Sequence, residues 1–202
     1  MISFEMVDGF LTDQQCDWFI ELFKKQESVL GTSGSGPIQL VELTTRISYY
    51  HEVKFLAAAL ARQSPIPNSF VDYMQVVQRG PGCALGAHFD FEDTVYSGVT
   101  YLNEDFEGGR TFLEDEEDRH VVEPKKGRSI FFRGSAIKHG LNMISEGERY
   151  TIASWFRDTK PVPAEIIKIA RQRETERARI NHPHGYTSQR GKPLFKNHER
   201  LP

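Results

Sequence analysis

Between residues 70 and 156, six short β-prone runs follow one another with no helical pattern between them. Glycine and proline turn signals, such as Gly80-Pro81-Gly82 and Gly108-Gly109, separate these runs. Many short strands joined by turns are typical of a β-sandwich or a jelly roll. The predicted strands are Val71–Val77, Gly98–Leu102, Thr111–Leu113, Arg119–Val122, Ser129–Phe132 and Tyr150–Phe156.

Two helices are predicted before these strands. Thr12 and Gln15 have the spacing of a capping box, so we expect a helix from Leu11 to Gln26. A second helix is expected from Glu52 to Arg62, and the glycine- and serine-rich segment Gly31–Pro37 is predicted to be a mobile loop. The residues expected to face inward are Cys16, Phe19, Ile20 and Phe23 in the first helix and Val53, Leu56, Ala57 and Leu60 in the second.

These patterns predict one mainly β domain with flanking helices (α+β) over residues 1–158. Residues 159–202 are expected to form a helix at Ala164–Ile180 and then a basic extended tail. The whole chain has a net charge of −3, yet from Thr159 onward ten Lys and Arg residues face four Asp and Glu. Because no stacking aromatics are interleaved with these charges, we expect a solvated tail and no nucleic-acid partner.

The sequence also indicates where the protein works. No apolar run approaches the length of a membrane span, and the first residues lack the features of a secretory signal. The two cysteines, Cys16 and Cys83, share no C-x-x-C spacing, which disfavours a disulfide framework. We therefore expect a soluble, cytoplasmic protein with no membrane partner.

His88 and Asp90 form a His-x-Asp pattern on a strand or at a strand end. Residues i and i+2 lie on the same face of a strand, so both side chains can reach one point. Alone the tripeptide is a weak signal, since a surface histidine near a surface aspartate gives the same pattern. His139 follows the apolar strand Ser129–Phe132 and a short loop. Two histidines and one carboxylate are the ligand set that leaves open positions on Fe(II).

Arg149 opens a strand ten residues after His139. Alternation places Arg149, Thr151, Ala153 and Trp155 on one face of that strand. A guanidinium inside a jelly roll is costly unless it meets an anion, which it can bind through two parallel hydrogen bonds. Thr151 offers a further hydroxyl. The spacing therefore favours an anion-binding role for Arg149 over that of a surface arginine.

Several segments, taken in order, carry a family resemblance: His88-Phe89-Asp90, Val99–Phe112, Pro124–Phe132, His139 and Arg149–Phe156. Together they resemble the prolyl 4-hydroxylase-like branch of the 2-oxoglutarate/iron(II) dioxygenases, with similarity from about Asp72 to Phe156. The resemblance implies a double-stranded β-helix (jelly roll) core. It also implies that His88, Asp90 and His139 hold Fe(II) and that Arg149 holds the distal carboxylate of 2-oxoglutarate.

The same resemblance implies the cofactors and the outcome of the reaction. They are Fe(II), 2-oxoglutarate as co-substrate and O2, with ascorbate expected to stimulate turnover. Tyr101 matches a tyrosine that hydrogen-bonds the co-substrate, so we assign Tyr101 and Thr151 to co-substrate binding beside Arg149. Halogenating relatives carry a small residue in place of Asp90, so its presence predicts oxygen insertion. Trp155 matches an aromatic at the pocket floor, but ordinary core packing is the simpler interpretation.

The expected activity is hydroxylation of an unactivated C–H bond, with release of succinate and CO2. The expected partner is a small-molecule or peptidyl amino-acid substrate, such as proline. One alternative is a non-catalytic jelly-roll ligand-binding module or sensor, which a missing ligand or anchor would favour, and none is missing. A second alternative is a zinc hydrolase with the same ligands. No general base is evident near the triad, which disfavours the hydrolase.

The chain departs from the family pattern before the first ligand. Gln78 and Arg79 stand where many relatives have a tyrosine, and Leu85 stands where an aromatic is common. Arginine at position 149 also replaces the more common lysine. These departures indicate a substrate pocket unlike that of collagen-type enzymes. Arg79 is expected to be a surface arginine, with an acidic group of the substrate as the alternative partner.

Overall fold

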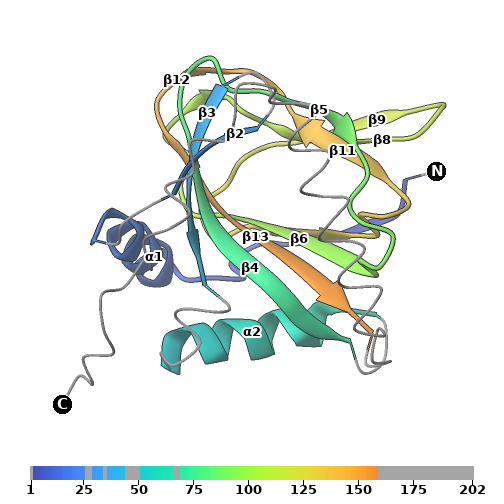
Figure 1. Ribbon diagram of the computed structural model, residues 1–202, viewed down its shortest axis with the longest axis horizontal. Helices are drawn as coiled ribbons and strands as arrows, with labels where there is room; N and C mark the ends of the chain where they lie inside the picture. Colours follow the sequence, from blue (N-terminus) through green and yellow to red (C-terminus); the bar gives the residue numbers. More distant parts are fainter. Residues whose placement is uncertain (1, 26–28, 34–35, 44–50, 66–68, 159–202) are drawn as a thin grey trace.

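The computed structural model describes residues 2–25, 29–33, 36–43, 51–65 and 69–158. Within them the strands form a seven-stranded sheet, a four-stranded sheet and a short two-stranded pair. In Figure 1 the two larger sheets lie one above the other, and both helices lie outside the seven-stranded sheet. This arrangement is a double-stranded β-helix with flanking helices, so the predicted fold class is confirmed.

The seven-stranded sheet is antiparallel and brings together strands that are distant in the sequence, because β13 lies between β6 and β4. Its strands in spatial order are β1 (Phe4–Val7), β10 (Ser129–Phe132), β6 (Tyr96–Tyr101), β13 (Arg149–Arg157), β4 (Phe70–Arg79), β3 (Gly36–Glu42) and β2 (Val29–Ser33). The four-stranded sheet contains β5 (Leu85–His88), β11 (Lys138–Leu141), β8 (Thr111–Glu114) and β9 (Arg119–Val122). The short pair is β12 (Ile144–Glu146) with β7 (Glu107–Gly108).

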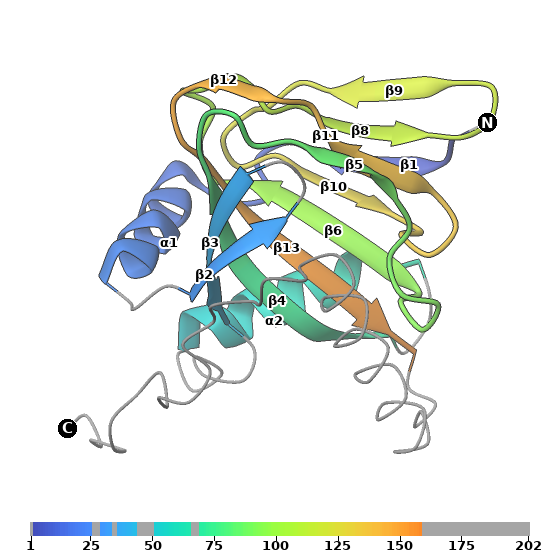
Figure 2. The same cartoon turned by 45° about the horizontal axis from the view of Figure 1, so that its top comes forward.

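Helices α1 (Asp13–Lys25) and α2 (His51–Gln63) cover the outer face of the seven-stranded sheet (Figure 2). The capping box is confirmed: the Thr12 N–H donates to Gln15 Oε1 at 2.9 Å, and the Gln15 N–H donates to Thr12 Oγ1 at 3.3 Å. Most side chains of the predicted apolar faces are buried. Ile20 and Ala57 are half-buried, and the side chain of Val53 lies outside the described part. The buried members are Cys16, Phe19, Phe23, Leu56 and Leu60.

Strand β13 shows how alternation positions the interior side chains. Ile152 and Phe156 join the apolar cluster beneath the helices, together with Met74 of β4. Arg149 and Thr151 have the opposite parity and line a cavity between the two sheets. The outer face therefore anchors the helices, and the inner face carries the candidate functional residues.

The prediction of a mobile loop at residues 31–37 is wrong. Strands β2 and β3 form a hairpin, of which residues 34–35 lie outside the described part, and β3 pairs in turn with β4. Ile38 lies opposite Arg79 in that pairing and lines the cavity. Glycine and serine favour loops locally, but hydrogen bonds to the neighbouring strand outweigh that preference.

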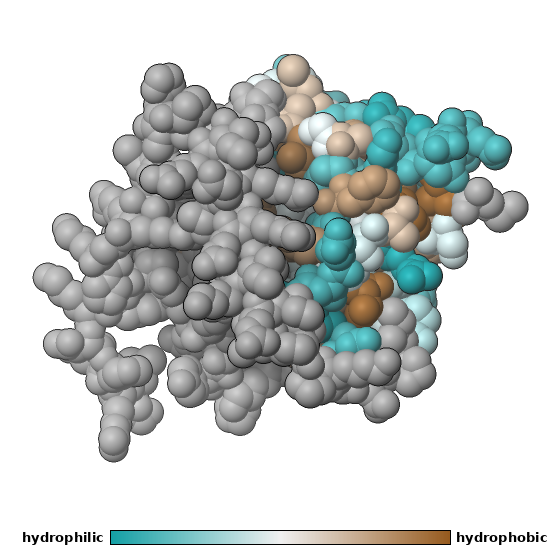
Figure 3. Space-filling model, turned by 45° about the vertical axis from the view of Figure 1, so that its right-hand side comes forward, coloured by the Kyte–Doolittle hydropathy of each residue, from teal (hydrophilic) through white to brown (hydrophobic). Residues whose placement is uncertain are grey.

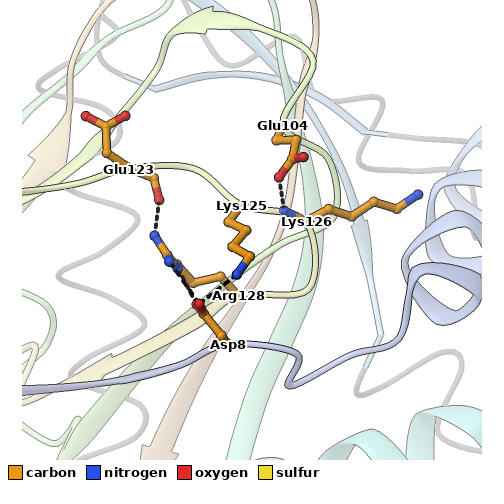
Figure 4. A network of polar contacts seen from close by, with 6 residues as sticks. All are labelled: Asp8, Glu104, Glu123, Lys125, Lys126 and Arg128. Atoms are coloured by element: carbon orange, nitrogen blue, oxygen red, sulfur yellow. Dashed lines mark hydrogen bonds and ion pairs between the residues drawn. The ribbon is translucent and has the colours of Figure 1, made fainter.

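The N-terminal strand β1 was not predicted, and an ionic network holds it against the edge of the sheet (Figure 4). Asp8, just after β1, accepts hydrogen bonds from Arg128 Nε at 2.6 Å and Lys125 Nζ at 2.8 Å. Arg128 also donates through Nη1 to the carbonyl of Glu123 at 2.8 Å. The hydrogen bonds from Arg128 and Lys125 hold the pKa of Asp8 well below its usual value, so Asp8 stays charged.

The acidic run Glu114–Asp118 begins at the half-buried last residue of β8 and continues as an exposed turn before β9. Asp115 Oδ1 accepts the backbone N–H groups of Glu117 at 3.0 Å and Asp118 at 2.9 Å. Figure 3 shows hydrophilic residues gathered over this hairpin, at the upper right of the molecule. The run therefore closes a hairpin as a solvated turn.

Other predictions concern the ends and the surroundings of the protein. The helix at 164–180 and the basic tail lie outside the described residues. Cys16 and Cys83 are both buried thiols, and the cytoplasmic location stays a prediction. The helices of the described part are too short or too polar to cross a bilayer.

Candidate metal and co-substrate site

The two candidate histidine ligands face each other across paired strands. His88 ends β5 and lies opposite His139 of β11, with ring centroids 4.3 Å apart. Asp90 follows the strand end, where its backbone N–H donates to the carbonyl of Gly134 at 2.9 Å. The candidate ligand atoms of these three residues all lie within 4.8 Å of one another. Among the described residues they are the one cluster of three or more His, Cys, Asp or Glu with this geometry.

Backbone carbonyls orient both imidazole rings. His88 Nδ1 lies 3.0 Å from the carbonyl oxygen of Gly86, and His139 Nδ1 lies 3.1 Å from that of Ile137. A ring nitrogen that faces a carbonyl carries the proton, which leaves Nε2 with the lone pair that a metal needs. Burial, and then the nearby ring of His139, lower the pKa of His88, so its ring is neutral at pH 7.

The carboxylate of Asp90 is held in its charged form. Burial alone raises the pKa of Asp90, but its interactions with His139, Ser97 and Trp155 outweigh it, and the pKa lies below its usual value. Ser97 Oγ donates to Asp90 Oδ2 at 2.5 Å, and His139 Nε2 lies 3.6 Å from the same oxygen. Two imidazole nitrogens and one carboxylate oxygen on one side of a cavity fit a divalent iron ion.

Two residues that support Asp90 were missed by sequence reasoning. Ser97 lies in β6 and gave no signal in the sequence, because its role depends on a contact with the loop after β5. A side chain at Gly134 would collide with Asp90 Oδ2 and Ser97 Oγ, so only glycine leaves the carboxylate its present place. Ser97 and Gly134 are brought next to Asp90 only by the folding of the chain, so their sequence neighbours do not reveal these contacts.

Arg149 is a buried cation that meets only neutral acceptors among the described residues. Its Nε donates to the carbonyl of Gly109 at 3.0 Å, Nη1 to Thr151 Oγ1 at 3.1 Å and Nη2 to Thr111 Oγ1 at 3.0 Å. The residue is 4% exposed, and burial lowers the pKa of its guanidinium. A buried charge without a counterion is costly, so this site fits an anionic ligand.

Tyr101 does not line the cavity itself but contacts Thr111, which does. Its hydroxyl donates to Thr111 Oγ1 at 2.7 Å and accepts the Thr111 N–H at 3.2 Å. The Arg149 Cζ lies 5.1 Å from the centroid of the Tyr101 ring. Tyr101 is fully buried, whereas Thr111 lines the cavity. Thr111 was missed in the sequence, although it follows the Gly108-Gly109 turn inside a segment that carries the family resemblance.

A cavity of about 330 Å³ connects the metal cluster to Arg149. Trp155, expected in the core, is half-buried, lines the cavity and helps to lower the pKa of Asp90. Arg79, expected at the surface, is 9% exposed and also lines the cavity, because β4 ends beside β13 inside the double-stranded β-helix. The polar and charged lining residues are Gln75, Arg79, His88, Asp90, Ser97, Thr111, His139, Arg149, Thr151 and Ser154.

Comparison with known proteins identifies the family that the segment carrying this site matches. Residues 74–157 match the 2OG-Fe(II) oxygenase superfamily. This segment is a 2OG-Fe(II) oxygenase domain. The oxygenase domain includes His88, Asp90, His139 and Arg149. Its superfamily works with Fe(II), 2-oxoglutarate and O2, and both the triad and the buried guanidinium fit these groups.

The oxygenase domain has curated relatives among the prolyl 3-hydroxylases. Human prolyl 3-hydroxylase 2 is 32% identical over 104 residues, which cover 46% of this chain and 14% of the relative. Chicken prolyl 3-hydroxylase 1 is 40% identical over 72 residues, which cover 34% of this chain and 10% of that protein. The chain thus spans about a seventh or less of the length of these relatives.

Solved structures show the same fold for this oxygenase domain. A Pseudomonas putida prolyl-4-hydroxylase has a TM-score of 0.66 at 18% identity, covering 78% of this chain and 94% of that one. The viral collagen prolyl hydroxylase of Paramecium bursaria Chlorella virus-1, solved with 2OG, has a TM-score of 0.61 at 24% identity, covering 77% and 96%. At these identities the likeness supports the double-stranded β-helix fold.

Proposed function

We propose that the protein is an Fe(II)- and 2-oxoglutarate-dependent hydroxylase that acts on a C–H bond of proline, either free or within a peptide. One observation carries this proposal: the His88, Asp90 and His139 cluster shares a single cavity with the buried guanidinium of Arg149. A metal-binding face and an anion-binding cation in one cavity match the two ends of a metal-chelating dicarboxylate.

In this proposal His88, Asp90 and His139 are the iron ligands. The carbonyls of Gly86 and Ile137 fix the two histidine tautomers before metal arrives, so each Nε2 is already available. The carboxylate of Asp90 stays charged and supplies the oxygen ligand. With 2-oxoglutarate and O2, iron bound here supplies the oxidising chemistry that hydroxylates the substrate and releases succinate and CO2.

Arg149 binds the distal carboxylate of 2-oxoglutarate in this proposal. Thr151 and Thr111 hold the guanidinium from two sides, and Tyr101 holds Thr111. These contacts orient the cation toward the cavity before the co-substrate enters, which reduces the entropy lost on binding. The role of Tyr101 is therefore to position Thr111 and Arg149.

The substrate class follows from several converging observations. The curated relatives are prolyl 3-hydroxylases, and prolyl hydroxylases recur among the similar structures. A Trichoplax adhaerens prolyl hydroxylase with a TM-score of 0.64 and 16% identity is solved with a peptide fragment of hypoxia inducible factor. These relatives support a prolyl substrate, and the cavity has room for a small ligand beside the co-substrate.

Succinate formation tests the proposal. The protein is incubated with Fe(II), 2-oxoglutarate and O2, with and without ascorbate, first alone and then with free amino acids and proline-containing peptides. We expect one proline-containing compound to stimulate succinate release and to gain 16 mass units from one oxygen atom. His139→Gln should abolish release, whereas His120→Gln, an exposed histidine on β9, should retain it. Folded, iron-loaded protein that forms no succinate with any compound would favour the ligand-binding module.

A further inference from the structure

Two exposed phenylalanines flank the candidate metal ligand Asp90. Phe89 is 49% exposed and Phe91 is 43% exposed. Neither ring belongs to an apolar cluster of the described residues, and neither lines the cavity. Single exposed apolar side chains are common on any protein, but neighbouring exposed rings beside a functional group are typical of a binding surface.

The ring of Phe89 lies where the segments that carry the metal ligands meet. Phe89 precedes Asp90 in the chain, and its ring centroid lies 5.8 Å from Nζ of Lys138. Lys138 is the neighbour of His139 in β11, and β5 and β11 lie side by side at the upper right of Figure 1. A molecule that reaches the metal site from outside therefore passes close to this ring.

The position of the two rings outside the cavity distinguishes a peptide from a free amino acid. Free proline is small enough to lie inside a cavity of about 330 Å³, where it covers neither ring. A peptide continues out of the cavity, and each residue of an extended chain spans about 3.3–3.6 Å. Residues one to three positions from the reacting proline therefore lie within about 11 Å of it, which is the surroundings of Phe89 and Phe91.

The charge around the rings disfavours a nucleic acid as the molecule that covers them. Residues 1–158 contain 15 Lys and Arg against 24 Asp and Glu. Lys138 lies opposite Glu114, which begins the acidic run Glu114–Asp118. A polyanion needs several cations for its phosphates, and among the described residues Lys138 is the one cation over either ring. An apolar segment of a peptide has no such requirement.

We propose that Phe89 and Phe91 bind an apolar side chain of a peptide substrate, at a residue one to three positions away from the proline that is hydroxylated. The proposal rests on the proposed function and selects a peptidyl substrate over free proline. The exposed half of a phenyl ring that becomes covered by an apolar side chain strengthens binding by about tenfold. The rings thus contribute affinity and specificity without contacting the reacting atoms.

Matched peptides test this proposal by binding alone. Protein loaded anaerobically with Fe(II) is titrated calorimetrically with 2-oxoglutarate and then with a host peptide that has three glycines on each side of one proline. In six pairs of derivatives, leucine or asparagine replaces one glycine, and these two side chains have nearly the same shape but differ in polarity. We expect leucine at one position or more to bind about tenfold tighter than asparagine, and about tenfold tighter than free L-proline.

Substitution of the rings assigns the leucine preference to them. In the double variant Phe89→Ala/Phe91→Ala the two peptides of a pair should bind within about twofold of each other, while affinities for Fe(II) and 2-oxoglutarate stay within about twofold of wild type. Phe89→Leu/Phe91→Leu, which keeps apolar surface, should retain part of the preference. Phe55→Ala, at a 55% exposed phenylalanine of α2, should leave all these affinities unchanged. Equal melting temperatures show that each variant is folded, and Phe89→Ala alone replaces the double variant if that one is not.

Turnover gives an independent readout. The double alanine variant should raise the KM of the preferred peptide by about tenfold and leave kcat within about twofold of wild type. This split is expected because the rings hold a part of the substrate that does not react, so they contribute equally to the ground state and the transition state.

Each of five results would overturn the proposal. The first three are no leucine preference at any position, an undiminished preference in the alanine variant, and a loss of Fe(II) or 2-oxoglutarate affinity in that variant as large as its loss of peptide affinity. The fourth is free L-proline that binds as tightly as the best peptide. The fifth is a single-stranded oligonucleotide that binds tighter than every peptide and loses affinity in the alanine variant.

Failure of the proposed function gives a different result, because 2-oxoglutarate then fails to bind in the first titration. The peptide pairs titrated without 2-oxoglutarate would in that case report on the two rings alone. A lack of leucine preference under those conditions would also overturn the proposal.

Discussion

Replacing Gly134 with alanine tests whether the space beside Asp90 keeps the metal site in shape. A Cβ at position 134 would lie well inside van der Waals contact with Asp90 Oδ2 and Ser97 Oγ. The backbone of residue 134 also accepts the Asp90 N–H, so the two segments cannot separate freely. The carboxylate must therefore move by about 1 Å to restore ordinary contact.

A displacement of this size has large consequences for a ligand. A misplacement of about 1 Å costs on the order of 100-fold in rate, and disturbed support of a ligand costs about 10- to 100-fold in metal affinity. We expect Gly134→Ala to weaken Mn(II) binding by that factor in calorimetry and to lower succinate formation at least as much. The overpacked site should also lose about 1–3 kcal/mol of stability in denaturant unfolding.

Gly80→Ala is the matched control, because the nearest heavy atom to a Cβ at position 80 is Gln78 Nε2 at 4.0 Å. Its metal affinity and stability should remain those of the wild type. The reasoning would be refuted by a folded Gly134→Ala protein that binds Mn(II) within about twofold of the wild type. In that case the carboxylate of Asp90 would not depend on the space at position 134.

Three further predictions follow from the buried and surface charges. Arg149→Met should raise the dissociation constant of 2-oxoglutarate in calorimetry by about 10- to 100-fold, because a charge-assisted pair is lost, and unchanged affinity would contradict the assigned anchor. The pKa of His88 in the folded protein lies below the value of about 6.5 expected in the unfolded chain. As the pH falls, the unfolded state therefore binds a proton before the folded state does. The metal-free protein should then lose stability as the pH falls below about 6.5. Denaturant unfolding at pH 7.5 and 5.5 should show this loss, and His88→Gln should reduce it. Asp8→Asn should lower the melting temperature, and the difference should shrink in about 0.5 M NaCl because exposed ion pairs with Arg128 and Lys125 are screened.

Local signals in the sequence were sufficient where the fold depends on local chemistry. The pattern at Thr12 and Gln15 predicted the start of α1 because a capping box closes within four residues. The runs of β4, β6, β8, β9, β10 and β13 were found because their β-branched and aromatic residues alternate between turns. The His88, Asp90, His139 and Arg149 set was found from spacing and resemblance, and the structure places all four around one cavity.

The sequence failed where distant segments decide the outcome. Strand β3 exists because it pairs with β4, which outweighs its glycine-rich start. Strand β11, which carries His139, is held between β5 and β8 and had no strong β-prone pattern of its own. The burial of Arg79 follows from its register with β13, and the hydrogen bond of Tyr101 depends on Thr111. None of these contacts can be read from neighbouring residues.

The three candidate ligands lie in elements of different rigidity, and this difference affects how long a bound metal stays in the site. His88 and His139 lie within a paired sheet, whereas Asp90 lies in the loop after β5. That loop is fastened to β13 by the ion pair of Asp93 with Arg157, at 2.8 Å. Loops open at a lower free-energy cost than paired strands. We therefore expect a weakened Asp93–Arg157 pair to shorten the residence time of a bound metal while the β-sheets stay folded.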